Sequence, residues 1–177
     1  MSFDDDDFAL FDVPARQRQD RAALDARWRA LQAEVHPDRF AAEGAAAQRV
    51  AMQWSVRVNE AYQRLKDPLR RAAYLCELRG APIDAERNTA MPADFLVRQM
   101  QWREALDEAV DAADVQALDE ALRAERDALY ATLECTLDGH DGAGGGDVAA
   151  AAAQVRALMF VERLRGDIDR RLEAAGH

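Results

Sequence analysis

One short segment carries most of the chemistry that this sequence could offer: His36-Pro37-Asp38. Its proline fixes one backbone torsion angle, so an imidazole and a carboxylate are held close together on a rigid turn. Catalysis would need further groups at matching spacing, and metal binding would need further ligands. The other histidines, His140 and His177, lie in a glycine-rich stretch and at the C-terminus, and no Cys/His or Ser/His pattern surrounds the turn. The turn is therefore better suited to recognition than to catalysis.

Two amphipathic helices must position this turn. The first begins near Asp20 and ends near His36, because the residue before a proline is displaced from helical geometry. Its apolar residues recur every three or four positions, at Leu24, Trp28, Leu31 and Val35. The second helix has an apolar face formed by Ala47, Val50, Trp54, Val58, Ala61 and Leu65. These two stripes predict an antiparallel helical hairpin with the tripeptide at its tip.

Shorter elements flank the hairpin on both sides. An apolar cluster, Phe-Ala-Leu-Phe at residues 8–11, precedes Pro14. After the second long helix, Asp67 is suited to the N-cap of another helix and Pro68 to its first position. This helix is expected to cover residues 69–78 and to close at Gly80.

The combination of hairpin, turn and flanking helices resembles a J-domain, the module that binds DnaK-type chaperones and stimulates their ATP hydrolysis. The resemblance implies that the stimulating loop consists of His36, Pro37 and Asp38. It implies that an acidic chaperone surface meets the basic residues Arg27, Arg29 and Arg39, the last standing where many members have lysine. The simpler alternative is that the proline only ends a helix, with solvated polar residues on either side.

Beyond Gly80 the sequence predicts a second helical region. Residues 80–93 lose the helical periodicity and are expected to form a linker. Three apolar stripes follow, the first on Phe95, Trp102, Leu106 and Val110. The second falls on Val115, Leu118, Leu122, Leu129 and Leu133, and the third on Val155, Leu158, Val161, Leu164, Ile168 and Leu172. With a glycine-rich loop at 139–146 between the last two, the pattern predicts a three-helix bundle over residues 94–177.

The first helix of this bundle has apolar residues outside its core stripe. At about 100° per residue, the positions lying about 80–180° from that stripe include Leu96, Val97 and Met100. Glu104 and Glu108 fall beside them, at about 160° and 200°. Phe160 lies about 120° from the centre of the stripe on its own helix. An apolar patch edged by carboxylates is typical of a partner-binding surface, and a broad core-facing stripe would give the same pattern.

The two halves together are similar to the HscB family, the J-type co-chaperones of iron–sulfur cluster assembly. The similarity runs from about Phe8 to Leu172 and includes residues 68–75 and, in the bundle, residues 95–100 and 103–108. It implies an L-shaped all-α protein with a J-domain at 1–79, a linker at 80–93 and a C-terminal three-helix bundle at 94–177. It also implies that the bundle binds the scaffold protein IscU through Leu96, Val97, Met100, Glu104, Glu108 and Phe160. Gln101 occupies a position where family members can carry an acidic residue.

Composition limits the classes of function that remain. The chain has 177 residues, 49% of them hydrophobic and 32% charged, with a net charge of −10. Such acidity argues against sequence-independent binding to nucleic acid, which needs an excess of Lys and Arg. Cys76 and Cys135 are too few for a disulfide framework or a four-cysteine zinc site and are expected to be structural thiols. Residues 1–80 carry as many basic as acidic side chains, so the whole negative charge belongs to the second half.

The sequence therefore predicts a cytoplasmic co-chaperone that is not an enzyme and uses no metal or cofactor. Its Asp-rich N-terminus is unlike a signal or transit peptide, and no apolar run is long enough to span a membrane. The resemblance implies that its partners are the DnaK-type chaperone HscA and the scaffold IscU, and neither nucleic acid nor a membrane is expected to bind. The alternatives are a J-domain adaptor that delivers a different client, and a metal-dependent enzyme that uses the many carboxylates.

Overall fold

The computed structural model describes residues 2–84, 91, 93–139 and 146–175, and every regular element within these ranges is a helix. The all-α prediction is confirmed. The chain divides into two compact units, Met1–Leu75 and Cys76–His177. The linker predicted at 80–93 and the loop predicted at 139–146 stay predictions, because residues 85–90, 92 and 140–145 lie outside the described ranges.

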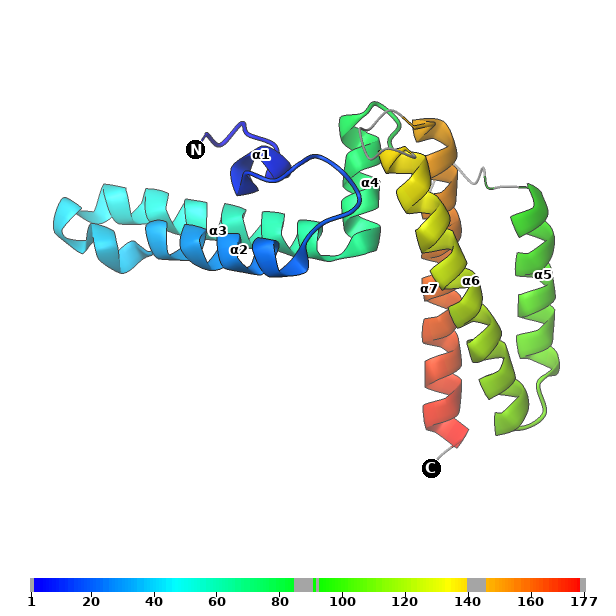
Figure 1. The fold of residues 1–177 in the computed structure, drawn as a ribbon. Coiled ribbons are helices and arrows are strands. Elements are labelled where there is room, and N and C mark those ends of the chain that lie inside the picture. The colour runs from blue at the N-terminus through cyan, green and yellow to red at the C-terminus, as the bar shows by residue number, and fades with distance from the viewer. Residues whose placement is uncertain (1, 85–90, 92, 140–145, 176–177) are drawn as a thin grey trace. The chain divides into compact units, whose positions relative to one another are not determined.

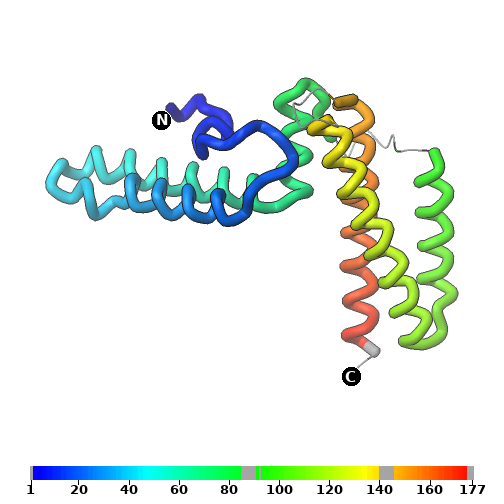
Figure 2. The backbone as a smooth tube through the Cα atoms, in the orientation of Figure 1, coloured from blue at the N-terminus to red at the C-terminus, as the bar shows by residue number. Residues whose placement is uncertain are grey.

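The first unit is built on a hairpin of two long helices. Its elements in chain order are α1 (Asp7–Phe11), α2 (Arg21–Glu34), the 3-10 helix η1 (Pro37–Glu43), α3 (Ala45–Lys66) and most of α4 (Pro68–Leu78). Helices α2 and α3 lie side by side and run in opposite directions (Figures 1 and 2). The predicted hairpin, with the tripeptide at its tip, is confirmed.

Local signals account for where these helices begin and end. Asp20 accepts hydrogen bonds from two backbone N–H groups in the first turn of α2, and Asp67 does the same for α4. Asp67 is therefore the N-cap that the sequence predicts, and Asp20 is the N-cap of the helix predicted to begin near it. Gly44 has a φ of 95° between η1 and α3, a conformation that glycine adopts without steric cost.

The core of the first unit comes from all four α-helices. Its buried apolar side chains include Phe8, Phe11, Leu24, Leu31, Val58, Ala61, Leu65, Ala72 and Leu75. Val50 lies on the predicted apolar face of α3, but it is 48% exposed and does not belong to this core. It lies in the first third of α3, where it lines an open groove with Ala47 and Trp54. The apolar stripe of α3 is thus longer than the core that it helps to form.

A buried carboxylate attaches α1 to α3. Asp7 has no exposed surface, and its two oxygens accept hydrogen bonds at 2.6 Å from Arg57 and at 2.6 Å from Arg64. Its backbone N–H donates to the hydroxyl of Tyr74 at 3.0 Å. A buried charge is tolerated only when opposite charges and hydrogen bonds compensate it, and here two guanidinium groups do so. This cluster fixes the short helix that carries Phe8 into the core.

The second unit is a bundle of three helices: α5 (Ala93–Glu108), α6 (Ala112–Asp138) and α7 (Val148–Ala175). Helices α6 and α7 lie side by side, with α5 beside α6 (Figure 1). Its main core cluster consists of Phe95, Val115, Leu118, Leu122, Ala157, Val161, Leu164 and Ile168. The predicted three-helix bundle is confirmed, but Val110 is 91% exposed and lies outside its core. The reason is that α5 ends two residues earlier, so Val110 no longer follows the face of that helix.

Candidate functional site

The turn at the tip of the hairpin presents an imidazole and a carboxylate to solvent. His36 has a φ of −63° and a ψ of 127°, the extended geometry that a following proline favours. Its Nδ1 accepts a hydrogen bond from the backbone N–H of Asp38 at 3.3 Å and lies 3.7 Å from Oδ2 of the Asp38 carboxylate. The two side chains are 57% and 92% exposed. The described residues contain no cluster of His, Cys, Asp and Glu that could hold a metal ion.

Hydrogen bonds from both sides hold this turn in place. The backbone N–H of Arg39 donates to the carbonyl of His36 at 3.0 Å, and its guanidinium donates to the carbonyl of Ala33 at 3.1 Å. From α3, the hydroxyl of Ser55 donates to the carbonyl of Val35 at 3.3 Å. Carbonyl groups at the end of a helix lack partners within the helix, and these donors supply them. Arg39, expected to contact the chaperone, therefore also stabilises the turn itself.

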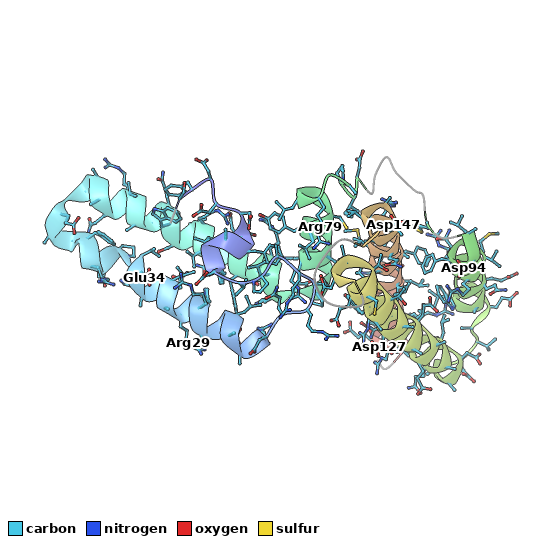
Figure 3. All side chains as sticks on the ribbon, turned by 45° about the horizontal axis from the view of Figure 1, so that its top comes forward. Arg29, Glu34, Arg79, Asp94, Asp127 and Asp147 are labelled. Atoms are coloured by element: carbon cyan, nitrogen blue, oxygen red, sulfur yellow. The ribbon has the colours of Figure 1, made fainter. Side chains whose placement is uncertain are left out.

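The two arginines predicted on α2 lie on different sides of that helix. Residues two positions apart on a helix point about 200° apart. Arg27 lies at the edge of the core stripe, where it is half-buried and its Nε has no hydrogen-bond partner among the described residues. Arg29 is exposed on α2, seven residues before His36, and its labelled side chain projects outward from the helix (Figure 3). Of the two arginines expected to contact the chaperone, Arg27 is therefore the less accessible to a partner.

A hydrogen-bonded cluster near the start of α2 neutralises a third arginine. The carboxylate of Asp25 accepts hydrogen bonds from the hydroxyl of Tyr62 at 2.7 Å and from Arg21 at 2.8 Å. These two donors, the tyrosine first, lower the pKa of Asp25 below its usual value. The same hydrogen bond, together with burial, raises the pKa of Tyr62. Arg21 is thus already paired, whereas Arg29 has no ion-pair partner among the described residues.

On α5, three apolar side chains face away from the core. Leu96, Val97 and Met100, which we call the α5 strip, are 40%, 57% and 70% exposed, whereas the neighbouring Phe95 is fully buried. The predicted separation of these residues from the core stripe is confirmed. Glu104 is also exposed, as is Glu108 at the end of the helix. An apolar strip therefore lies on the same helix as two solvated carboxylates.

Phe160 does not join the exposed strip. Its ring is half-buried and packs edge-to-face against Phe95, with the ring centroids 5.9 Å apart. The guanidinium of Arg103 lies 5.2 Å from the centroid of the same ring. The expectation that Phe160 points away from the core is wrong, because α5 packs against this side of α7. Phe160 lines a groove of about 270 Å³ between the two helices.

Similar proteins identify the family of this chain. Over 180 residues it is 51% identical to the co-chaperone protein HscB homolog of Burkholderia mallei (strain SAVP1), and the match covers 100% of this chain and 99% of that protein. The chain belongs to the HscB co-chaperone family. Residues 91–169 match a family model described as the HSCB C-terminal oligomerisation domain.

Solved structures of HscB proteins share its fold. Chaperone HscB from Vibrio cholerae is 33% identical with a TM-score of 0.76, and the match covers 96% of this chain and 99% of that chain. The human co-chaperone protein HscB is 25% identical with a TM-score of 0.84, covering 97% of this chain and 84% of that chain. Both matches include both units of the structure.

Membership of the HscB family settles the general role of the chain. It is a J-type co-chaperone of iron–sulfur cluster assembly, and a DnaK-type chaperone is its partner. Its relatives are named co-chaperones, a class whose members are generally not enzymes, and no catalytic activity is indicated. Within the described residues, no helix is both long enough and apolar enough to cross a membrane.

Two features of the structure were missed by the sequence interpretation. One is the cluster around Asp7, whose partners lie 50 and 57 residues away and leave no local signal. The other is the groove beside Phe160, whose charged walls come from both α5 and α7. A signal for the groove was available, since each helix carries an Arg and an Asp four positions apart, at Arg103 and Asp107 and at Arg163 and Asp167.

Proposed function

We propose that this chain, in the cytoplasm, brings the scaffold protein IscU to the DnaK-type chaperone HscA and stimulates ATP hydrolysis by that chaperone. The proposed chaperone contacts are His36, Pro37, Asp38, Arg27, Arg29 and Arg39. The proposed scaffold contacts are Leu96, Val97, Met100, Glu104, Glu108 and Phe160. Residues 1–79 act as the J-domain, residues 80–93 as a linker and residues 94–177 as the scaffold-binding bundle.

The exposure of the turn supports the chaperone end of this proposal. A carboxylate that is 92% exposed adds little to the stability of the fold, and its charge is free to pair with a cation of the partner. Arg29 is exposed on the helix that leads into the turn and adds a positive charge with no ion-pair partner among the described residues. The turn and this arginine together offer both signs of charge to one partner.

The observation that carries the scaffold end is the α5 strip. Apolar side chains exposed singly are ordinary on protein surfaces, but Leu96, Val97 and Met100 adjoin one another on one helix. Contiguous exposed apolar surface is typical of a protein–protein interface, and exposed carboxylates beside it are typical of a polar rim. The strip therefore fits a partner that presents apolar side chains surrounded by basic groups.

Replacement of Asp38 by asparagine tests the chaperone end. We expect Asp38→Asn to abolish stimulation of HscA ATP turnover, because the charge is lost while the exposed site leaves the fold intact. The matched control is Glu60→Gln, which removes one exposed negative charge from α3. Unchanged stimulation by Asp38→Asn, with circular dichroism equal to that of the parent, would show that the turn is not the stimulating loop.

A double replacement in the α5 strip tests the scaffold end. We expect Leu96→Ser with Met100→Ser to weaken IscU binding at least tenfold in calorimetry, because both side chains would lose contact with the partner. Stimulation of the chaperone without IscU should stay at the parent level. The matched control is Val110→Ser, which removes a more exposed apolar side chain from the same unit. Parent-like IscU affinity of the double variant would favour the alternative, an adaptor that delivers a different client.

A further inference from the structure

The half-buried position of Phe160 raises the question of how a partner could reach it. The groove beside it has an apolar lining formed by Leu106, Phe160 and Leu164. Its volume of about 270 Å³ lies just below the range of about 300–1,000 Å³ that is typical of small-molecule sites. The groove is therefore better matched to one or two side chains of a protein partner than to a whole small ligand.

The charged walls of the groove decide which side chain fits. Arg103 and Asp107 line it from α5, and Arg163 and Asp167 line it from α7. Asp167 already pairs with Arg170 of its own helix. The other three charged residues of the groove have no ion-pair partner among the described residues. The unpaired groups are therefore two cations, Arg103 and Arg163, and one anion, Asp107.

This local excess of positive charge contrasts with the rest of the unit. Residues 81–177 carry the whole net negative charge of the chain, so two unpaired arginines at one groove are an exception to their surroundings. Guanidinium groups bind carboxylates through two parallel hydrogen bonds and form stronger contacts than neutral donors do. A carboxylate is thus the group that best complements Arg103 and Arg163.

We infer that the groove receives an acidic side chain of the scaffold protein, with its carboxylate bound by Arg103 and Arg163 and its aliphatic part resting on Phe160. Arg103 now stacks on the phenylalanine ring, 5.2 Å from its centroid. When its guanidinium turns to the partner's carboxylate, the ring is uncovered for contact. The inference rests on the proposed function, because the groove adjoins the α5 strip: Arg103 follows Met100 by less than one helical turn.

Single charge replacements test this inference, with calorimetric binding of IscU by the full chain as the readout. We expect Arg163→Gln and Arg103→Gln each to weaken binding about tenfold at low salt, and less at high salt. Asp107→Asn should strengthen binding, because it removes the one unpaired anion of the groove. Arg103→Lys should fall between parent and Arg103→Gln, since it keeps the charge and loses the planar donor pair. The matched control is Arg126→Gln on α6, which removes the same charge away from the groove and should bind as the parent does.

The outcomes separate this inference from the proposed function. Arg163 is exposed and forms no hydrogen bond or ion pair with the described residues, so parent-like affinity of Arg163→Gln would overturn the inference without ambiguity from misfolding. Changes in IscU affinity opposite to those expected, with weaker binding by Asp107→Asn and stronger binding by the arginine variants, would mean that the groove receives a basic side chain. This result would also overturn the inference. A change in the oligomeric state of these variants in the absence of IscU would also overturn it, because such a change would assign the groove to a second copy of this chain. If the α5 strip variant also binds normally, the proposed function itself fails.

Discussion

Replacement of Asp7 by asparagine tests how the first unit is held together. The substitution keeps the size of the side chain and removes its charge, so it acts on the ion pairs and not on packing. In the folded protein this carboxylate is fully buried and lies 2.6 Å from Arg57 and 2.6 Å from Arg64. The variant leaves both cations facing a neutral amide in a buried site.

The loss in the free energy of unfolding depends on the contacts that Arg57 and Arg64 keep in the variant. Removal of one partner from a buried ion pair costs about 3–5 kcal/mol. The lower end applies here, because Arg57 keeps its hydrogen bond to the carbonyl of Asp5 at 2.9 Å. Arg64 keeps its stacking on Tyr74, 4.7 Å from the ring centroid, and its side chain is 39% exposed, so water replaces part of the lost contact. We expect the free energy of unfolding to fall by about 3 kcal/mol. For a unit of this size, this corresponds to a melting temperature roughly 12–24 °C lower.

Urea unfolding followed by tryptophan fluorescence measures this change. Trp28 and Trp54 belong to the first unit, so a Trp102→Phe background makes the signal specific to it. The control is Asp4→Asn, which removes an exposed negative charge three residues earlier. A difference below about 1 kcal/mol between Asp7→Asn and this control would refute the conclusion that a buried ion-pair cluster anchors α1.

Three further predictions concern other contacts. Asp111→Ala should lower the stability of the second unit by about 1 kcal/mol in thermal unfolding, because it removes the N-cap and one half of the capping box of α6. At pH 8 a thiol reagent should modify the exposed Cys135 in the folded protein, and Cys76 only on unfolding. Cys76 is fully buried, and burial raises its pKa to about 11, which keeps the thiol protonated. In Tyr62→Phe, titration by NMR should show the pKa of Asp25 rising towards its usual value, because the largest cause of its depression is removed.

Elements set by local chemistry could be predicted from the sequence. Asp20 and Asp67 cap helices because a carboxylate accepts hydrogen bonds from backbone N–H groups two and three residues ahead, which is a short-range property. The spacing of apolar residues likewise reports which face of a helix is buried, as Leu24 and Leu31 illustrate. The proline turn followed from the same local rules.

Features that depend on distant residues could not be predicted in this way. A helical wheel assumes that the helix continues, and it failed at Val110, which lies beyond the last residue of α5. It also takes no account of the neighbouring helix, and so it misplaced Phe160, which α5 covers. The buried state of Asp7 depends on two arginines of α3 that only the folded chain brings near.

The composition of α5 is difficult to explain by the stability of the bundle alone. Phe95 is the one buried residue in its 16 positions, whereas α6 buries seven residues in 27. Because most helical stability in proteins comes from packing of an apolar face, α5 gains little from the bundle while its strip exposes apolar surface to water. A scaffold protein that covers the strip would bind the folded helix and not the unfolded one, and it would therefore stabilise α5 by mass action. The two apolar faces of α5 are then explained together, since one packs on the bundle and the other serves the partner.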